Sequence, residues 1–252
     1  MNRIFYVEEV AVKTRIDQLL VTRGLCASRE KAQRAIMAGR VTVGGQRAEK
    51  PGLQVATDAQ VEVHGGEKYV GRGGLKLEAA LDHFKLSVDG KICVDIGAST
   101  GGFTDCLLQR GAARVHAIDV GRGQLDWKLR NDSRVVLHEG VNARYLSAGD
   151  LGELAQICVV DVSFISLALI LPAAFALLPE AADMIVLIKP QFELSAAKVG
   201  RGGVVRDASL RWEAVEKIRR YVEEKGRQWL AVIECPLPGR EGNIEFLAHL
   251  RT

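Results

Sequence analysis

The chain has 252 residues, of which 48% are hydrophobic and 26% charged, with a formal net charge of +3. This composition is typical of a soluble globular protein with one or two domains, and it excludes a disordered chain, a collagen and a bundle of membrane helices. The longest apolar stretch, Leu167–Leu178, is shorter than the roughly 20 residues that cross a bilayer and contains Pro172. We therefore expect a buried helix there and no membrane partner.

Cysteine usage and the N-terminal residues indicate a compartment. The five cysteines lie far apart and include no Cys-x-x-Cys pair, a pattern typical of reduced thiols in a cytoplasmic protein. The first 15 residues carry Glu8, Glu9 and Lys13 where a secretory signal would have an apolar region. We expect a cytoplasmic protein that requires no metal.

The charge is unevenly divided along the chain. Residues 1–75 carry 12 Lys and Arg against 8 Asp and Glu, a net charge of +4, whereas residues 76–252 carry a net charge of −1. Nine of the cations and only three anions lie in residues 11–50. Such a basic segment favours a polyanionic partner, although a solvated basic surface explains the charge equally well.

The basic segment also shows local order. Ile16, Leu19 and Leu20 recur at helical spacing before Gly24, and Ser28 can cap a helix that follows it. Alternating valines predict short strands, with Gly44-Gly45 as a hairpin turn after the first of them. The predicted elements are two helices, at Arg15–Arg23 and Arg29–Ala38, and two strands, at Val41–Val43 and Val61–Val63.

This segment resembles the small RNA-binding domain of ribosomal small-subunit protein four, which also occurs in pseudouridine synthases. The resemblance rests on Ser28-Arg29-x-x-Ala32, Ile36-x-x-Gly39-x-Val41-x-Val43-x-Gly45 and Val61-x-Val63. It implies a small α+β RNA-binding domain over residues 14–63, preceded by an N-terminal arm of residues 1–13. The cations that we expect to contact RNA are Arg15, Arg29, Lys31, Arg34, Arg40 and, beyond this domain, Arg72.

A second domain follows a glycine-rich linker. Residues 64–74 contain five glycines and almost no apolar periodicity, which indicates a linker. A helix over Leu75–Leu86 then places Lys76 on a different stripe from its apolar residues. From Lys91, apolar runs alternate with helical segments, of which Ser209–Gly226 is the clearest, as in βαβ units. The predicted strands are Ile92–Ile96, Val115–Asp119, Val135–Glu139, Ile157–Asp161, Ile185–Lys189, Trp229–Cys235 and Ile244–Leu250.

This pattern predicts an α/β domain over residues 75–252, with an open, mostly parallel sheet of seven strands. In such sheets a ligand binds beyond the carboxyl ends of the strands. The first strand leads into Gly97-Ala98-Ser99-Thr100-Gly101-Gly102-Phe103-Thr104. The spacing differs from a dinucleotide fingerprint, and the lysine of a phosphate-binding loop is missing.

A third interpretation of this turn is the nucleophile elbow of a serine hydrolase, because Gly97-x-Ser99-x-Gly101 lies between a strand and a helix, and Asp161 and His249 follow. Against it, no earlier strand could supply an oxyanion loop, and His249 lies within an alternating strand. All three interpretations share a turn that lets a ligand approach the backbone closely.

Asp119 ends the second predicted strand, where an acid can bind both hydroxyls of a ribose. A carboxylate without a phosphate cradle suits a nucleoside that carries no phosphate, such as S-adenosylmethionine. Asn142, in the turn after the third strand, stands where many methyltransferases place an acid that binds the adenine amine. An amide can also bond to a base edge.

Four charged residues belong to the same edge of the predicted sheet: Lys76, Asp161, Lys189 and Glu245. A surface ion pair explains each of them alone, but together they fit methyl transfer to a ribose 2′-hydroxyl, which needs a positioned base. We assign Lys189 as that base, Lys76 as a neighbouring cation that orients the hydroxyl, and Asp161 and Glu245 as the groups that hold both lysines. A neighbouring cation favours the neutral form of a lysine base.

Residues 14–252 resemble the TlyA (hemolysin A) family of ribosomal RNA 2′-O-methyltransferases, whose methyltransferase domain is of the FtsJ type. The resemblance rests on Arg72-Gly73-Gly74-Leu75-Lys76-Leu77, residues 97–104, Asp119-Val120-Gly121-x-Gly123-Gln124-Leu125, Leu129-Arg130-Asn131-Asp132, Asp161-Val162-Ser163-Phe164-Ile165-Ser166-Leu167, Lys189-Pro190-Gln191-Phe192-Glu193 and Gly242-Asn243-Ile244-Glu245.

The resemblance implies a Rossmann-like class I methyltransferase fold, S-adenosylmethionine as cofactor, and a cytidine of ribosomal RNA in an assembled subunit as substrate. The residues expected to bind the cofactor are Gly97, Ala98, Ser99, Gly101, Gly102, Phe103, Thr104, Asp119, Asn142 and Asp161. A non-catalytic RNA-binding or ribosome assembly factor with the same fold is the main alternative.

Overall fold

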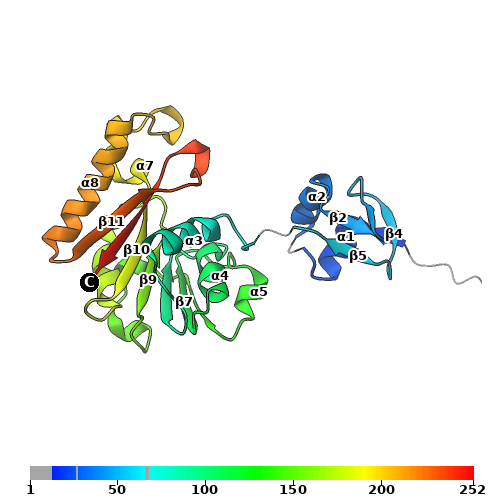
Figure 1. The fold of residues 1–252 in the computed structure, drawn as a ribbon, viewed down its shortest axis with the longest axis horizontal. Coiled ribbons are helices and arrows are strands. Elements are labelled where there is room, and N and C mark those ends of the chain that lie inside the picture. The colour runs from blue at the N-terminus through cyan, green and yellow to red at the C-terminus, as the bar shows by residue number, and fades with distance from the viewer. Residues whose placement is uncertain (1–12, 27, 66–67) are drawn as a thin grey trace, which may run out of the picture. The chain divides into compact units, whose positions relative to one another are not determined.

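The computed structural model describes residues 13–26, 28–65 and 68–252, and it divides the chain into two compact units, residues 1–68 and 69–252 (Figure 1). The expected N-terminal arm, residues 1–13, lies outside the described residues except for Lys13. The expected linker, residues 64–74, contributes to both units. Tyr69 is only 3% exposed and packs into a hydrophobic cluster of the second unit, which therefore begins earlier than the helical periodicity indicated.

The first unit packs two helices against short strands around Ile16, Leu20, Ile36 and Val41. Both predicted helices are present, and the Ser28 hydroxyl caps the second by accepting a hydrogen bond from the amide of Lys31. The sequence did not predict β1, β3 and β4, because strands of two or three residues are too short to show alternation. The elements are β1 (Lys13–Arg15), α1 (Ile16–Thr22), α2 (Arg29–Met37), β2 (Val41–Val43), β3 (Gln46–Arg47), β4 (Gln54–Ala56) and β5 (Val61–Val63).

The second unit is built on a seven-stranded sheet in the order β11-β12-β10-β9-β6-β7-β8. The strands are β6 (Ile92–Ile96), β7 (Arg114–Asp119), β8 (Val135–Glu139), β9 (Ile157–Val160), β10 (Asp183–Ile188), β11 (Gln228–Glu234) and β12 (Phe246–Arg251). All neighbouring pairs are parallel except those that involve β12. The prediction of a seven-stranded, mostly parallel sheet is confirmed.

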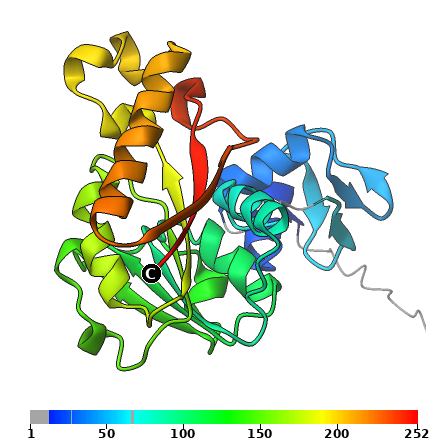
Figure 2. The ribbon, with the colours of Figure 1, turned by 60° about the vertical axis from the view of Figure 1, so that its left-hand side comes forward.

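Helices cover both faces of this sheet (Figures 1 and 2). The α-helices are α3 (Gly73–Phe84), α4 (Gly102–Gln109), α5 (Trp127–Arg130), α6 (Leu171–Ala176), α7 (Pro190–Glu193) and α8 (Ala208–Glu224). The 3-10 turns are η1 (Ala143–Tyr145), η2 (Ala148–Asp150), η3 (Leu167–Leu169), η4 (Ala196–Lys198), η5 (Arg201–Gly203) and η6 (Arg240–Gly242).

The period-two alternation of the strands divides the core into two hydrophobic clusters. In β6, Val94 and Ile96 join the cluster formed with α6 and α8, whereas Cys93 joins the cluster formed with α3 and α4. The buried helix predicted at Leu167–Leu178 is shorter than expected. Its first three residues form η3, before α6 begins, and Pro172 lies in the first turn of α6, where a missing N–H is tolerated.

The direction of β12 determines which residues meet at the carboxyl edge of the sheet. Because β12 runs antiparallel to β10, with Phe246 opposite Ile188, the start of β12 lies beside the end of β10. Glu245 therefore lies at the same edge as Lys189, as the sequence predicted for an antiparallel last strand.

Across the described ranges, no helix combines the length and apolar character needed to cross a membrane. The same residues contain no group of three or more His, Cys, Asp or Glu side chains that could hold a metal ion.

Candidate active site

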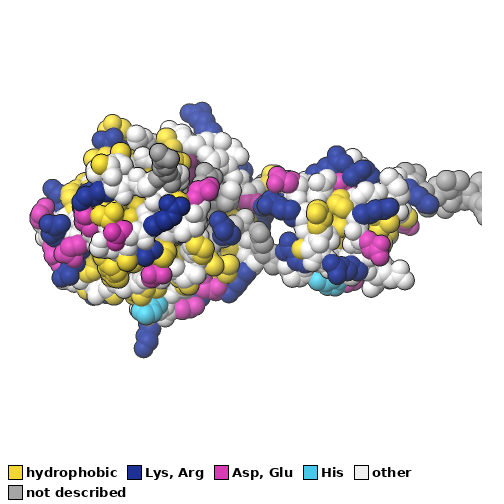
Figure 3. All heavy atoms as spheres, turned by 90° about the horizontal axis from the view of Figure 1, so that it is seen from above, with side chains coloured by type: hydrophobic (Ala, Val, Ile, Leu, Met, Phe, Trp, Pro, Cys, Tyr) yellow, Lys and Arg dark blue, Asp and Glu magenta, His cyan; other side chains and the backbone are white. Residues whose placement is uncertain are grey.

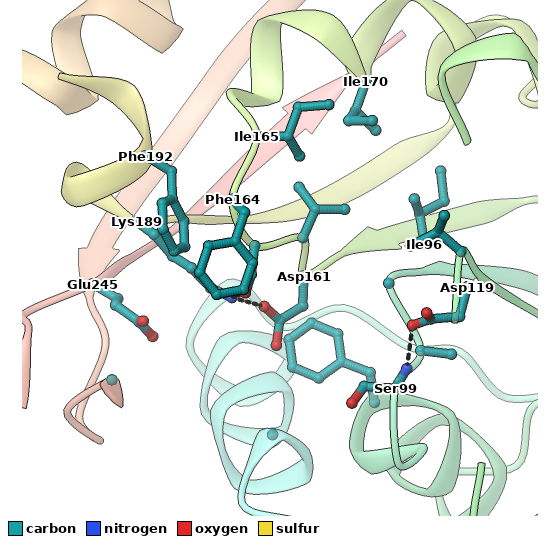
Figure 4. Close-up of a pocket in the computed structure, with 18 of the residues that line it drawn as sticks. Ile96, Ser99, Asp119, Asp161, Phe164, Ile165, Ile170, Lys189, Phe192 and Glu245 are labelled. Carbon is teal, nitrogen blue, oxygen red and sulfur yellow. Dashed lines mark hydrogen bonds and ion pairs between the residues drawn. The ribbon is translucent and has the colours of Figure 1, made fainter. Parts of the chain in front are cut away.

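A pocket of about 910 Å³ lies at the carboxyl ends of β6, β7, β9 and β10 (Figure 4). Each of these strands ends in, or is directly followed by, a residue that lines the pocket: Gly97 after β6, Asp119 at the end of β7, Asp161 after β9 and Lys189 after β10. This placement agrees with the general location of ligands in open α/β sheets. Lys76 of α3 and Glu245 before β12 complete the charged part of the wall.

Glycine is required where the turn after β6 meets the turn after β9. Gly97 has a φ of 89°, and a Cβ atom there would lie 2.2 Å from the carbonyl oxygen of Asp161. Gly101 has a φ of 95°, and a Cβ atom would meet the side chain of Leu129 at 2.3 Å. Both the conformation and the crowding exclude a side chain at either position. The backbone itself therefore forms the wall at Gly97, whereas Gly101 packs against Leu129 outside the pocket lining.

Asp119 has both carboxylate oxygens fixed by backbone amides. Oδ2 accepts a hydrogen bond from the amide of Ser99 at 2.7 Å, the contact drawn in Figure 4, and Oδ1 accepts one from Gly121 at 2.7 Å. A carboxylate oxygen can accept more than one hydrogen bond. The side chain is therefore held in one orientation and keeps acceptor capacity for two neighbouring hydroxyl groups of a ligand.

The structure divides the residues expected to bind a cofactor into two sets. Gly101 and Thr104 do not line the pocket, whereas the lining does include Gly97, Ala98, Ser99, Gly102, Phe103, Asp119, Asn142 and Asp161. Thr104 is fully buried and donates a hydrogen bond to Asp95 at 2.6 Å. The expected direct contact of Thr104 with a ligand is corrected: its hydroxyl holds Asp95, whose pKa burial raises to about 7.

Lys76 and Glu245 form one of two lysine–carboxylate pairs in the pocket. Nζ of Lys76 lies 2.5 Å from Oε2 of Glu245, and the two side chains are 11% and 3% exposed. Gly239 gives the carboxylate its space, because a Cβ atom there would lie 2.1 Å from Oε1 of Glu245. The pair joins α3 to the segment that enters β12.

Lys189 and Asp161 form the second pair, marked by a dashed line in Figure 4. Nζ of Lys189 lies 2.5 Å from Oδ1 of Asp161 and donates a hydrogen bond to Oγ of Ser163 at 2.8 Å. The Lys189 side chain is 11% exposed. All four residues selected from the sequence therefore line one pocket, as two pairs with one lysine in each.

Two aromatic residues of the pocket were quoted only within sequence motifs, and neither of them was assigned a role. Phe164 is 82% exposed, has a φ of 65°, and its ring centroid lies 5.1 Å from that of Phe192 (Figure 4). Both residues line the pocket. A large apolar side chain this exposed, in a conformation that bulky residues rarely adopt, indicates a surface that meets a ligand.

The hydrolase interpretation fails on geometry. Nε2 of His249 lies 2.9 Å from Oδ1 of Asp183, at the start of β10, whereas Ser99 follows the carboxyl end of β6. Parallel neighbours in the sheet place these positions at opposite edges. Ser99 Oγ instead lies 3.4 Å from Gln124 Oε1, so Ser99, Asp161 and His249 do not form a triad.

In the first unit, two of the cations expected to bind RNA also surround a buried acid. Arg15 donates from Nε and Nη2 to the carboxylate of Asp17 at 3.0 and 2.9 Å, and Arg29 donates from Nε at 2.9 Å. These hydrogen bonds, with that of Arg15 the largest cause, hold the pKa of Asp17 well below its usual range. Arg15 and Arg29 remain 38% and 50% exposed.

The other cations expected to bind RNA differ in their surroundings. Arg34 is 66% exposed, and Arg40 donates from Nη1 to the carbonyl oxygen of Gly65 at 3.0 Å. Lys31 is half-buried on α2. Lys and Arg side chains are spread over the face of this unit shown in Figure 3. Arg72, by contrast, precedes α3 of the second unit and lines its pocket.

Comparison with known proteins identifies the family. A family model described as FtsJ-like methyltransferase matches residues 69–252. A relative from Mycobacterium tuberculosis (strain ATCC 25618 / H37Rv), named 16S/23S rRNA (cytidine-2′-O)-methyltransferase TlyA, is 47% identical over 245 residues, which cover 96% of this chain and 91% of the relative. The chain belongs to the TlyA family of FtsJ-like methyltransferases. The resemblance predicted from the sequence motifs is confirmed.

Other similarities extend over the same TlyA-family chain. A model described as S4 domain matches residues 14–61, which confirms the resemblance of the first unit. A protein of Bacillus subtilis (strain 168) named "Putative rRNA methyltransferase YqxC" is 48% identical over 94% of this chain and 85% of its own. A solved structure, "Putative hemolysin from Streptococcus thermophilus", is 44% identical with a TM-score of 0.73 and covers 96% of this chain and 90% of its own.

Proposed function

We propose that the protein transfers the methyl group of S-adenosylmethionine to the ribose 2′-hydroxyl of a cytidine in ribosomal RNA, within an assembled ribosomal subunit. The observation that carries this proposal is the convergence of two lysine–carboxylate pairs on a pocket that also contains Gly97 and Asp119. The name of the relative that is 47% identical supports the substrate. The S4 match and the basic composition of residues 11–50 support RNA binding.

The residues present fit S-adenosylmethionine. Gly97 lines the pocket with backbone alone, and Asp119 has acceptor capacity for the two ribose hydroxyls. Asn142 lines the same pocket and can bond to the edge of the adenine. The volume of about 910 Å³ lies near the upper end of the range for small-molecule sites, roughly 300–1,000 Å³, which leaves room for a nucleoside beside the cofactor.

When bound, S-adenosylmethionine supplies a methyl group on a positively charged sulfur, open to attack by a nucleophilic oxygen. Lys189 can act as the base only in its amine form, in which it accepts the proton of the 2′-hydroxyl while the new O–C bond forms and the bond between the methyl carbon and the sulfur breaks. Asp161, 2.5 Å away, stabilises the ammonium that results. Lys76, held in place by Glu245, would place a positive charge near the negative charge that develops on the attacking oxygen.

The two phenylalanines provide a surface for the target base. To bring its 2′-hydroxyl to Lys189, a nucleotide inside an RNA helix has to leave the stack. Phe164, which is 82% exposed, and Phe192 offer an apolar face at the pocket. Stacking on an aromatic side chain replaces part of the stacking energy that the base loses.

The decisive experiment measures transfer of labelled methyl groups from S-adenosylmethionine to ribosomal subunits and to free RNA. We expect label in a subunit, mapped to one cytidine as a position resistant to alkaline cleavage, since 2′-O-methylation removes the attacking hydroxyl. A chain that binds the cofactor but labels neither subunit nor free RNA contradicts the proposal and identifies a non-catalytic assembly factor instead.

An enzyme that acts on ribosomal subunits works in the cytoplasm, the location that we propose.

A further inference from the structure

Glu193 is a buried acid behind the pocket. It ends α7, the short helix that follows Lys189, and its side chain is only 1% exposed. It does not line the pocket. Burying a carboxylate is costly unless hydrogen bonds or an opposite charge compensate for the lost water.

The compensating groups come from two elements. Oε1 accepts a hydrogen bond from the amide of Leu167 at 2.8 Å, and Oε2 accepts one from the hydroxyl of Ser166 at 2.5 Å. Lys217 of α8 lies 3.5 Å from Oε2 and donates to the Glu193 carbonyl oxygen at 2.5 Å. Glu193 thus joins the segment 161–167, which follows β9, to the segment 189–193, which follows β10.

These two segments carry four of the groups assigned above to the reaction or to the target base, together with Ser163, which accepts a hydrogen bond from Lys189. The first carries Asp161, Ser163 and Phe164, and the second carries Lys189 and Phe192. They meet on the pocket side through the Lys189–Asp161 pair at 2.5 Å and the Phe164–Phe192 contact at 5.1 Å. On the buried side they meet where Glu193 accepts a hydrogen bond from Ser166, which lies two residues beyond Phe164 in the first segment.

The backbone at Phe164 needs such an anchor. A bulky residue at a φ of 65° is strained, and the conformation persists only where the surroundings hold it. Ser166 and Leu167, the residues that Glu193 binds, end this strained loop. The Ser166 hydroxyl also accepts a hydrogen bond from the amide of Ala168 and so caps η3.

We propose that Glu193 is a positioning residue for methyl transfer: its carboxylate sets the separation of the two segments, and thereby places Lys189 against Asp161 and Phe164 against Phe192. This inference rests on the proposed function. Because small displacements of reacting groups of about 1 Å cost roughly 100-fold in rate, loss of this anchor should reduce turnover although Glu193 touches neither substrate nor cofactor.

The test compares E193A with D183A. Asp183 starts β10, the strand that α7 follows, and accepts hydrogen bonds from His249 and Arg251 at 2.9 and 2.8 Å, far from the pocket. Both variants lose a multiply bonded carboxylate, so both should lower the melting temperature. We expect only E193A to lower kcat, by about 10- to 100-fold, while the Kd of S-adenosylmethionine stays within about twofold of wild type. E193Q should restore most of kcat, since its amide oxygen still accepts from Leu167.

The outcomes separate this inference from the proposed function. Equal kcat for E193A and D183A overturns the positioning role while wild-type transfer still stands. No transfer by the wild-type protein overturns the proposed function itself. If E193A does not fold, S166A decides, because it removes one hydrogen bond of Glu193 and leaves the carboxylate in place: a kcat about fivefold lower supports the role, and a kcat equal to wild type overturns it.

Discussion

Lys189 and Asp161 directly follow the neighbouring parallel strands β10 and β9, and their side chains meet with Nζ 2.5 Å from Oδ1. Each residue follows a run of fully buried strand residues, so the pair lies where the hydrophobic core gives way to the pocket. A charge at this boundary is only partly hydrated and depends on its partner. The functional predictions begin with this pair.

Replacing Lys189 with Ala should remove the proposed base. We expect kcat to fall by at least about 100-fold, the lower end of what a general base contributes, with cofactor affinity close to wild type. Single-turnover methyl transfer and calorimetric titration measure the two quantities. Lys198→Ala is the matched control, because Lys198 pairs with Glu213 on the surface and does not line the pocket. Wild-type turnover in Lys189→Ala would exclude Lys189 as the base.

Asp119→Asn should act on cofactor binding. The amide keeps one acceptor oxygen, but its NH2 group opposes the backbone amide that the lost oxygen bound. Hydrogen bonds to a charged group contribute about 1.5–3 kcal/mol, so we expect the Kd of S-adenosylmethionine to rise about 10- to 100-fold. Asp207→Asn, at the cap of α8, should leave the Kd unchanged. An unchanged Kd in Asp119→Asn would remove Asp119 from the cofactor site.

Phe164→Ala should impair use of the RNA and spare the cofactor. Loss of one stacked base costs about 1–3 kcal/mol, which predicts a decrease of about 5- to 150-fold in kcat/KM for the ribosomal subunit. Phe164→Tyr, which keeps the ring, should retain most of the activity. A decrease confined to cofactor affinity would show that the ring serves the other half of the pocket.

Asp95 should make stability depend on pH. Burial raises its pKa from 3.8 to about 7, and Thr104 donates to it. Between pH 4 and 7 the folded protein therefore binds more protons than the unfolded chain, so this residue's contribution falls as pH rises through that window. Since one pKa unit corresponds to about 1.4 kcal/mol, we expect the free energy of unfolding of wild type to fall by a few kcal/mol relative to Asp95→Asn. Chemical denaturation of both proteins across the window measures this difference, and parallel curves would contradict the prediction.

Much of the second unit was predictable because strand alternation and strand ends are local features. Asp119, Asp161 and Lys189 could be placed at one edge because each follows an apolar run, and parallel strands end together. Which carboxylate pairs with which lysine could not be predicted. Lys76 and Glu245 are separated by 169 positions, and only the register of β12 against β10 brings them together.

Three further residues were missed or misassigned because their roles depend on exposure, burial and side-chain direction, which the sequence does not show locally. Phe164 has no reactive group that would mark it in the sequence. It was recognised by its exposure and its positive φ, which only the structure shows. Glu193 was quoted only as part of a motif, since nothing local indicates that it is buried against Ser166 and Leu167. Thr104 was misassigned because a hydroxyl in a glycine-rich turn suggests a ligand, whereas the fold points it at Asp95.

The contact between Lys76 and Glu245 also bears on when the pocket becomes complete during biosynthesis. β12 lies between β10 and β11, so it inserts into the sheet only after both of its neighbours have been translated. Lys76 lacks its carboxylate partner until then. The charged wall of the pocket is therefore complete only in chains whose translation has passed Glu245.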